Sequence, residues 1–242
     1  MVSKKKTFSK NLSSGILRLM SLQVLYEDNH IIAVYKPAGF LVQPDLPGGG
    51  SLMDDVKKYL KDKYKKQGNV FLGLVHRLDR NVSGVVLFAK TSKGAARLSE
   101  QFRNNEIKKI YYAIVEGKIS LTKGNLIHYL RKDEERRVAL VSDVPKDGYD
   151  RAELSYKAIL HTTNYSLLSI SLKTGRFHQI RAQLSAVGHP VVGDKKYGAK
   201  SKMPDGSLAL CATEIEFKTA TTHEIKTIRI DYPKEWNKFV EW

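Results

Sequence analysis

The stretch "FLGLVHRLDRNVSGVVLFAK", Phe71 to Lys90, combines two apolar runs with a polar connection between them. The runs "FLGLV" and "GVVLFAK" are short and bounded by polar residues, which predicts two buried strands. The connection carries a single carboxylate, Asp79, between Arg77 and Arg80. We therefore expect a strand, a turn that holds one acid among cations, and a second strand.

Strand and helix patterns continue on both sides of this stretch. Further strands are expected at 22–27, 30–36, 107–117, 136–142, 151–160, 164–172, 208–219 and 224–233. Helices are expected at 51–66, where Ser51 is the cap, at 91–106 with a Thr91 or Ser92 cap, at 176–188, and over a few residues at the C-terminus. No repeat, linker or break in composition separates these elements, so the sequence predicts one α+β domain.

The charge balance indicates the kind of partner. The 242 residues contain 41 Lys and Arg against 25 Asp and Glu, a formal net charge of +16. Such an excess favours a polyanion, nucleic acid before an acidic membrane surface, over a basic protein that is merely soluble. The single cysteine, Cys211, excludes an internal disulfide and a cysteine-rich zinc site, and no segment has the pattern of a signal peptide or a membrane span. We expect a cytoplasmic protein with a flexible basic tail at residues 1–22 and a folded domain at 23–242.

One cation in the helix expected from Arg176 requires a partner. Steps of 100° per residue place four apolar residues on one stripe, with Arg181 at its edge: Phe177, Ile180, Leu184 and Val187. A half-buried guanidinium is tolerated when a carboxylate binds it, and Asp79 is a suitable carboxylate. Such a pair would keep Asp79 ionised at neutral pH, ready to act as a nucleophile or to stabilise a developing sugar cation. From the turn alone, a purely structural ion pair explains the pattern at least as well.

Four segments in order resemble the motifs of the RluA-type pseudouridine synthases, which rearrange uridine to pseudouridine within RNA. They are "KPAGFLVQP" at 36–44, "HRLDRNVSGVVLFAK" at 76–90, "KKIYYAIVEG" at 108–117, and "LKTGRFHQIRAQL" at 172–184 followed by "GHPVVGDKKYG" at 188–198. The resemblance extends over about residues 23–232. It implies a pseudouridine-synthase-like catalytic domain, with a mixed, mainly antiparallel central sheet flanked by helices and loops, and a central cleft.

The resemblance also implies roles for individual residues. Asp79 would be the catalytic aspartate, Tyr111 would stack on the target uracil and take the proton from its ring carbon, and Arg181 would pair with Asp79. Arg77 would fill the gap that the extruded nucleotide leaves. The further RNA-binding candidates are His76, Arg80, Arg176, His178 and Lys36, although for the histidines and arginines a turn contact or a solvated face is nearly as good an interpretation.

The implied partner is RNA, in a ribosomal or transfer RNA stem-loop. The resemblance implies that no cofactor is needed. All bonds that break and form lie within the uridine, and the sequence contains no phosphate-binding Gly-Lys loop and no zinc-type spacing, so no metal is expected. We expect a monomer that makes no membrane contact. Val82, Tyr35 and Gln43 stand where the family commonly has Thr, Asn and His, which bears on substrate choice more than on activity.

Two other functions are compatible with the same residues. An RNA-binding module on this scaffold would not require the Asp79 carboxylate. A metal-free RNA phosphoesterase would use His76 and His178 as acid and base. Even for an isomerase, the sequence leaves open whether Asp79 attacks the base, attacks the sugar, or assists elimination at the sugar.

Overall fold

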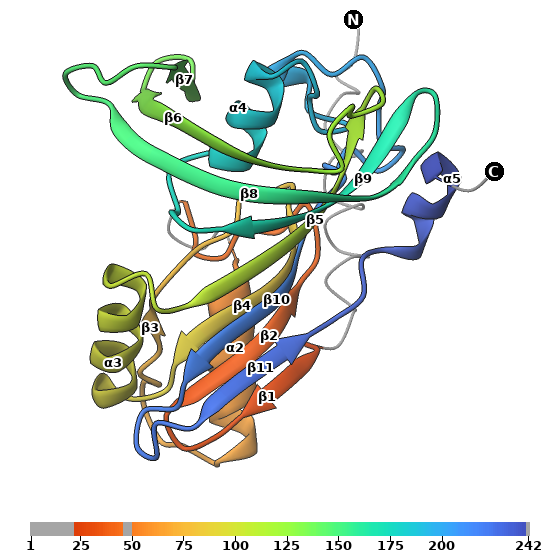
Figure 1. Cartoon of the computed structure of the whole chain (residues 1–242). Coiled ribbons are helices and arrows are strands. Elements are labelled where there is room, and N and C mark those ends of the chain that lie inside the picture. Colours follow the sequence, from red (N-terminus) through yellow and green to blue (C-terminus); the bar gives the residue numbers. More distant parts are fainter. Residues whose placement is uncertain (1–21, 46–49, 241–242) are drawn as a thin grey trace, which may run out of the picture.

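The two apolar runs that flank Asp79 form antiparallel strands, β3 (Gly73–Leu74) and β4 (Ser83–Ala89). They belong to a computed structural model in which residues 22–45 and 50–240 are described (Figure 1). The basic tail expected at residues 1–22 therefore lies outside the described residues, apart from Leu22. Where the folded domain begins, expected at residue 23, thus stays a prediction.

The described strands form one mixed sheet. The other strands are β1 (Val24–Glu27), β2 (Ile31–Lys36), β5 (Lys108–Glu116), β6 (Lys123–Asp133), β7 (Val138–Ser142), β8 (Asp150–His161), β9 (Tyr165–Leu172), β10 (Leu210–Lys218) and β11 (Ile225–Arg229). Their order is β1-β2-β4-β10-β5-β9-β8-β6-β7, with β11 paired to β10 and β3 to β4. The described strand pairs are antiparallel except β4 with β10, which is parallel, and this confirms the predicted mixed, mainly antiparallel sheet.

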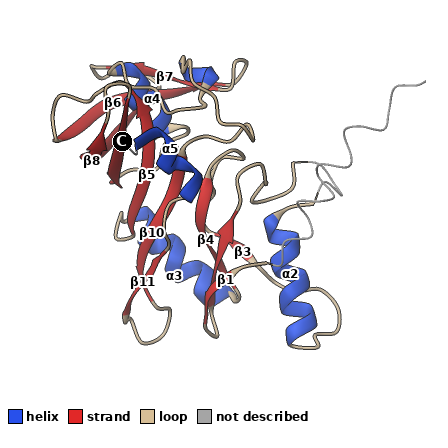
Figure 2. Cartoon of the chain, turned by 90° about the vertical axis from the view of Figure 1, so that its right-hand side faces the viewer, coloured by secondary structure: helices blue, strands red, loops and turns tan. Residues whose placement is uncertain are grey.

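Helices cover both faces of the part of the sheet that contains β2 and β4. The helices are α2 (Leu52–Lys63), α3 (Ser92–Arg103), α4 (Gln179–Ala186) and α5 (Asn237–Val240), with two short 3-10 turns, η1 (Lys195–Tyr197) and η2 (Lys234–Trp236). Alternate residues of β2 pack in two clusters: Ile32 lies with Leu60 of α2, and Ile31 lies with Leu98 of α3. Because both faces are covered, β4 is buried along its whole length (Figure 2).

Strand β5 joins the two halves of the molecule. It pairs with β10 on one side and with β9 on the other (Figure 1). Beyond β9, the half formed by β8, β6 and β7 supports α4, whose Ala182 packs against Leu130 and Ala152. The Asp79 turn comes from one half and α4 from the other. The junction between the halves is therefore where their side chains can meet.

Local signals predicted the helices α2 and α3 correctly. Ser51 caps α2, because its hydroxyl accepts a hydrogen bond from the Asp54 backbone N–H, and Thr91 caps α3 in the same way. The sequence did not predict β6. Only two of its 11 residues are buried and most are polar, so the strand is recognisable only from its pairing with β7 and β8.

Helix α4 begins three residues later than predicted. His178 has a left-handed backbone (φ 52°), and the Gln179 side-chain oxygen accepts hydrogen bonds from the Arg176 backbone N–H and the Thr174 hydroxyl. These bonds hold 174–178 as a loop. Phe177 is thus outside the helix, whereas Ile180 and Leu184 are buried as predicted. Val187, also predicted on the buried stripe, is exposed, because α4 ends at Ala186 and Val187 is only its C-terminal cap.

Candidate active site

The Asp79 turn is held by backbone hydrogen bonds to its neighbours. Val82 N–H donates to the Asp79 carbonyl (3.1 Å), Gly39 N–H to the Arg80 carbonyl (2.8 Å), and Leu208 N–H to the Asn81 carbonyl (3.0 Å). The Asp79 side chain remains 31% exposed. One of these hydrogen bonds closes the turn and the other two attach it to neighbouring loops. The turn therefore holds the Asp79 carboxylate at a partly solvent-exposed position on a fixed backbone.

Arg181 contacts Asp79, as the helical pattern predicted. Its Nη1 lies 2.9 Å from Asp79 Oδ2, and its side chain is only 8% exposed. Burial alone would lower the pKa of Arg181, but the hydrogen bonds to Asp194 and the charges of Asp194 and Asp79 outweigh it and raise that pKa. The guanidinium is permanently charged and already oriented toward Asp79.

Asp194 is a second partner of Arg181 that sequence reasoning missed. Its carboxylate accepts two hydrogen bonds, from Arg181 Nε (2.6 Å) and Nη2 (2.9 Å), and its side chain is 1% exposed. The Asp194 carbonyl also accepts hydrogen bonds from the backbone N–H groups of Tyr197 and Ala199, so the residue forms a turn as well. The available signal was that a buried arginine has more N–H groups than one carboxylate can bind.

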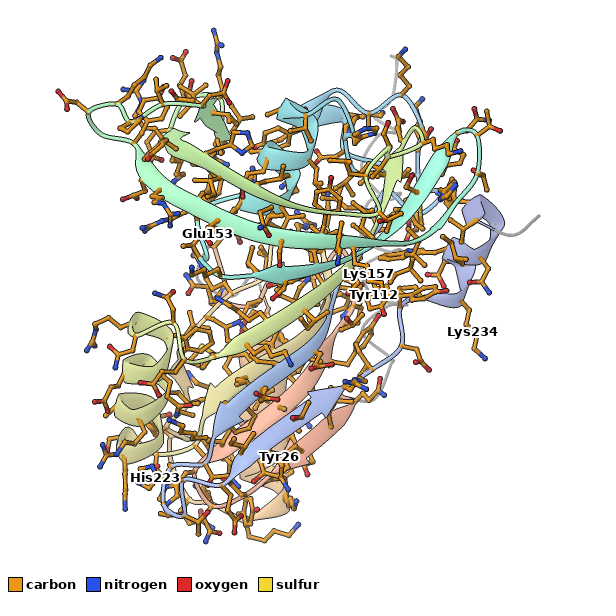
Figure 3. The ribbon with its side chains drawn as sticks, in the orientation of Figure 1. Tyr26, Tyr112, Glu153, Lys157, His223 and Lys234 are labelled. Carbon is orange, nitrogen blue, oxygen red and sulfur yellow. The ribbon has the colours of Figure 1, made fainter. Side chains whose placement is uncertain are left out.

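Tyr111 lies beside Asp79 in a cavity of about 100 Å³. The cavity is lined by Arg77, Leu78, Asp79, Val82, Tyr111, Leu172, Gly175, Arg176, His178, Gln179, Ile180, Arg181 and Leu210. Burial, and then the nearby Asp79 charge, raise the pKa of Tyr111, so the phenol is protonated at neutral pH. Tyr112 points to the opposite face of β5 and stacks on Tyr232 at 5.5 Å (Figure 3).

His178 contacts the carboxylate cluster from the loop before α4. Its Nδ1 lies 3.0 Å from the Tyr197 hydroxyl and its Nε2 3.6 Å from Asp79 Oδ2, and its ring stacks on Phe177. Burial lowers the pKa of His178 to about 4, so the ring is neutral at pH 7. The contact with Asp79 is consequently not an ion pair at that pH.

Lys36, expected to bind RNA, is completely buried, and that expectation is corrected here. Its ammonium donates to the carbonyls of Pro37 (3.0 Å), Phe40 (2.9 Å) and Arg80 (2.9 Å). A phosphate cannot reach a nitrogen that is enclosed and bound in this way. Lys36 instead ties the 37–40 loop to the residue that follows Asp79.

His76 is also bound within the protein rather than directed at the cavity. Its Nε2 accepts a hydrogen bond from Leu87 N–H (2.9 Å), and its ring stacks on Phe102 of α3. Burial, and then the Lys109 charge, lower the pKa of His76 to about 3. The cavities beside Asp79 include His178 and not His76, so the structure does not bring the two histidines together as an acid and base.

The three remaining candidates are exposed arginines at the rim. Arg77 and Arg176 line the small cavity, and Arg80 lines a larger one next to it. Arg80 Nε donates to the Gly39 carbonyl, and Arg176 Nε to the Arg151 carbonyl. All three could contact a polyanion without breaking the core.

Other features of the described residues bear on cofactors and membranes. Within 22–45 and 50–240, no three His, Cys, Asp or Glu side chains come together in a way that could hold a metal ion. No helix in these ranges is long and apolar enough to cross a membrane. Cys211, the single cysteine, is fully buried.

Comparisons with known proteins match these motifs and this architecture. A family model described as RNA pseudouridylate synthase matches residues 30–186. The tRNA pseudouridine synthase C of Haemophilus ducreyi is 36% identical over 189 residues, 74% of this chain and 75% of that protein. The ribosomal large subunit pseudouridine synthase D of Zymomonas mobilis is 33% identical over 222 residues, 88% of this chain and 69% of that protein. The solved structure of human RNA pseudouridylate synthase domain containing 4 has the same fold, with a TM-score of 0.74 at 21% identity over 93% of each chain.

Proposed function

This chain belongs to the RNA pseudouridylate synthase family, and on that basis we propose that it isomerises specific uridines of ribosomal or transfer RNA, with Asp79 as the catalytic carboxylate. The relatives named for ribosomal and transfer RNA support both substrate classes. The observation that carries the assignment is the exposed Asp79 carboxylate, which Arg181 holds beside Tyr111 in one cavity.

The reaction exchanges one bond for another within the uridine. The N1–C1′ glycosidic bond breaks, the uracil turns, a C5–C1′ bond forms, and C5 loses its proton while N1 gains one. Atoms and electrons balance without an oxidant, a reductant or a second substrate. We therefore assign no cofactor to the reaction.

Asp79 acts on a uridine that has left its helix. Extrusion costs a few kcal/mol, and stacking on an aromatic ring offsets part of that cost. Tyr111 supplies the ring, next to the apolar side chains of Leu210 and Val82. An ionised Asp79 can then attack the base or the sugar, or assist elimination at the sugar, and each route needs the charge that Arg181 stabilises.

Tyr111 has a second role late in the reaction. We assign its hydroxyl oxygen to take the C5 proton after the C5–C1′ bond has formed. The phenol is protonated at neutral pH, because its ordinary pKa of about 10 is raised further by burial and by the Asp79 charge. It therefore takes the C5 proton only as its own proton passes to the Asp79 carboxylate, which lines the same cavity. We assign the whole catalytic domain to residues 23–242, acting as a monomer in the cytoplasm.

The first experiment replaces Asp79 by Asn and by Ala. Wild-type protein and the variants are incubated with ribosomal and transfer RNA transcripts that carry tritium at uridine C5, after circular dichroism has shown that all fold. We expect tritium release by wild type alone, with at least a 10³-fold loss in both variants, because the carboxylate is required in every route. RNA affinity should change little.

Release that survives in Asp79→Asn would exclude the proposed role of this carboxylate. Binding without release by wild type, on either RNA class, would favour an RNA-binding module. Cleavage of the transcript would favour a phosphoesterase.

A further inference from the structure

A second, larger cavity lies next to the one that contains Tyr111. Its volume is about 410 Å³, within the range of small-ligand sites. The two cavities share Asp79, His178 and Arg181 and differ in the rest of their walls. A strand of RNA whose uridine occupies the small cavity would therefore pass directly into the large one.

The wall of the larger cavity is cationic. It carries five Lys or Arg side chains and two carboxylates, and both carboxylates are bound by Arg181. Lys195 and Lys202 are exposed, and their ammonium groups have no hydrogen-bond or ion-pair partner among the described residues. Among residues 22–45 and 50–240, the Lys196 ammonium donates only to the Arg137 carbonyl, at 3.3 Å. The cavity thus has positive charge that the described residues do not neutralise.

The backbone that carries these lysines is fixed. Lys195 and Lys196 belong to η1, which directly follows the buried Asp194. The loop before Lys202 is held by the Glu116 carboxylate, which accepts from the backbone N–H groups of Lys200 (2.8 Å) and Ser201 (2.6 Å). A site whose wall is already in place loses less free energy when its ligand binds.

The far side of the cavity is held by close packing of two backbones. At Gly193 (φ 90°) an added Cβ would lie 2.5 Å from the Ser207 carbonyl oxygen. Only glycine allows that approach, which brings the 203–208 loop against the turn that carries Asp194. The larger cavity is therefore part of the fold rather than a gap between loose loops.

We propose that this cavity binds the phosphodiester backbone of the nucleotide next to the target uridine, through Lys195, Lys196 and Lys202. The ligand class is single-stranded RNA, since a space of this size takes one nucleotide and not a helix. Lysine ammonium groups commonly bind the phosphates of nucleic acids, and these three have no carboxylate partner among the described residues. The inference rests on the proposed function, because it assumes that the target uridine lies beside Asp79.

The test measures how salt weakens RNA binding. The probe is a fluorescein-labelled oligouridylate of ten nucleotides, and each protein carries Asp79→Asn so that the probe is not modified. In the cavity variant, Lys195, Lys196 and Lys202 are replaced by Gln. Each phosphate contact on a single strand contributes about 0.7 to the slope of log K against log salt, so the slope should become shallower by about 2.

A matched variant controls for net charge. Lys57, Lys61 and Lys65 lie on α2 or just after it, at the end of the molecule remote from α4 (Figures 1 and 2). Their replacement by Gln removes the same charge, and we expect the salt slope to remain that of the parent. Equal changes in the two variants would overturn the proposal, because the lysines would then act only through the overall field.

A second probe separates RNA from other anions. An oligoglutamate of the same charge should bind the parent and the cavity variant with the same salt slope; an equal loss for both probes would also overturn the proposal. Tritium release by the protein with an intact Asp79 tests the proposed function independently. An unchanged slope together with normal release would refute the cavity assignment alone.

Discussion

At the scale of single residues, the position of Asp79 depends on a residue that is not beside it in the sequence. Arg181 donates two hydrogen bonds to Asp194 and one to Asp79. The bidentate contact with Asp194 fixes the plane of the guanidinium. The direction of the Nη1–H group that binds Asp79 is thereby fixed as well. Asp194 is thus a positioning residue, and the reacting carboxylate takes its orientation from it.

Replacing Asp194 by Asn tests this dependence. The change leaves a buried guanidinium with one of its two carboxylate partners, so we expect a loss of about 3 kcal/mol in the free energy of unfolding. Because Arg181 is then free to turn from Asp79, kcat for tritium release should fall at least tenfold, with a smaller change in KM. Urea unfolding and initial rates measure the two effects.

Asp205→Asn is the matched control for Asp194. Asp205 is exposed, and within the described part of the chain its carboxylate accepts only from the Ser207 backbone N–H and hydroxyl. We expect its replacement to cost less than about 1 kcal/mol and to leave kcat unchanged. Equal effects of the two substitutions would contradict the positioning role.

At the scale of elements, the site depends on the contact between β4 and β10. Their short parallel pairing places Gly84 opposite Ala212, with an added Cβ at Gly84 only 2.4 Å from the Ala212 carbonyl oxygen. Gly84 also has a φ of 129°, which disfavours other residues. The pairing connects the end of the Asp79 turn to the strand that neighbours β5.

Gly84→Ala should therefore separate β4 from β10. We expect a destabilisation of about 3 kcal/mol or more, the sum of backbone strain and steric overlap. Gly68→Ala is the control, because Gly68 also has a positive φ (77°) but nothing within 4 Å of the added Cβ. It should cost only the strain, about 1 kcal/mol. Chemical denaturation of both variants measures the difference, and equal costs would contradict the steric reason.

At the scale of the whole molecule, two partly buried histidines make stability depend on pH. Burial lowers the pKa of His76 to about 3 and that of His178 to about 4, below the ordinary value of 6.5. The unfolded chain binds protons at these sites below pH 6.5 while the folded protein does not. Stability should thus be greatest above pH 6.5 and decline as the pH falls toward 4.

We expect the free energy of unfolding to fall by a few kcal/mol between pH 7 and pH 4 at constant ionic strength. His76→Gln should make the decline shallower, since glutamine does not titrate and its side-chain oxygen can accept from Leu87 N–H as His76 does. Urea midpoints across the pH range measure both curves. Parallel curves for the variant and the wild type would exclude His76 as a source of the dependence.

Interactions between sequence neighbours were predictable. The hairpin of β1 and β2, the caps of α2 and α3, and the strands on either side of Asp79 follow from residues within one turn or one strand of each other. The contact between Arg181 and Asp79 was predicted as well, although its reason was only partly correct. Phe177 is outside the helix, and the buried edge of α4 is defined by Ile180 and Leu184 instead.

By itself, the sequence determined the class of fold, the family, and the presence of a carboxylate, a tyrosine and an arginine in motifs that belong together. Only the tertiary structure decided that Asp194 shares Arg181, that Lys36 and His76 face the protein rather than RNA, and that a cationic cavity adjoins Asp79. The reason is physical. Periodicity reports which side of an element is apolar, but the burial and partners of a charged group depend on which distant surfaces come to lie against it.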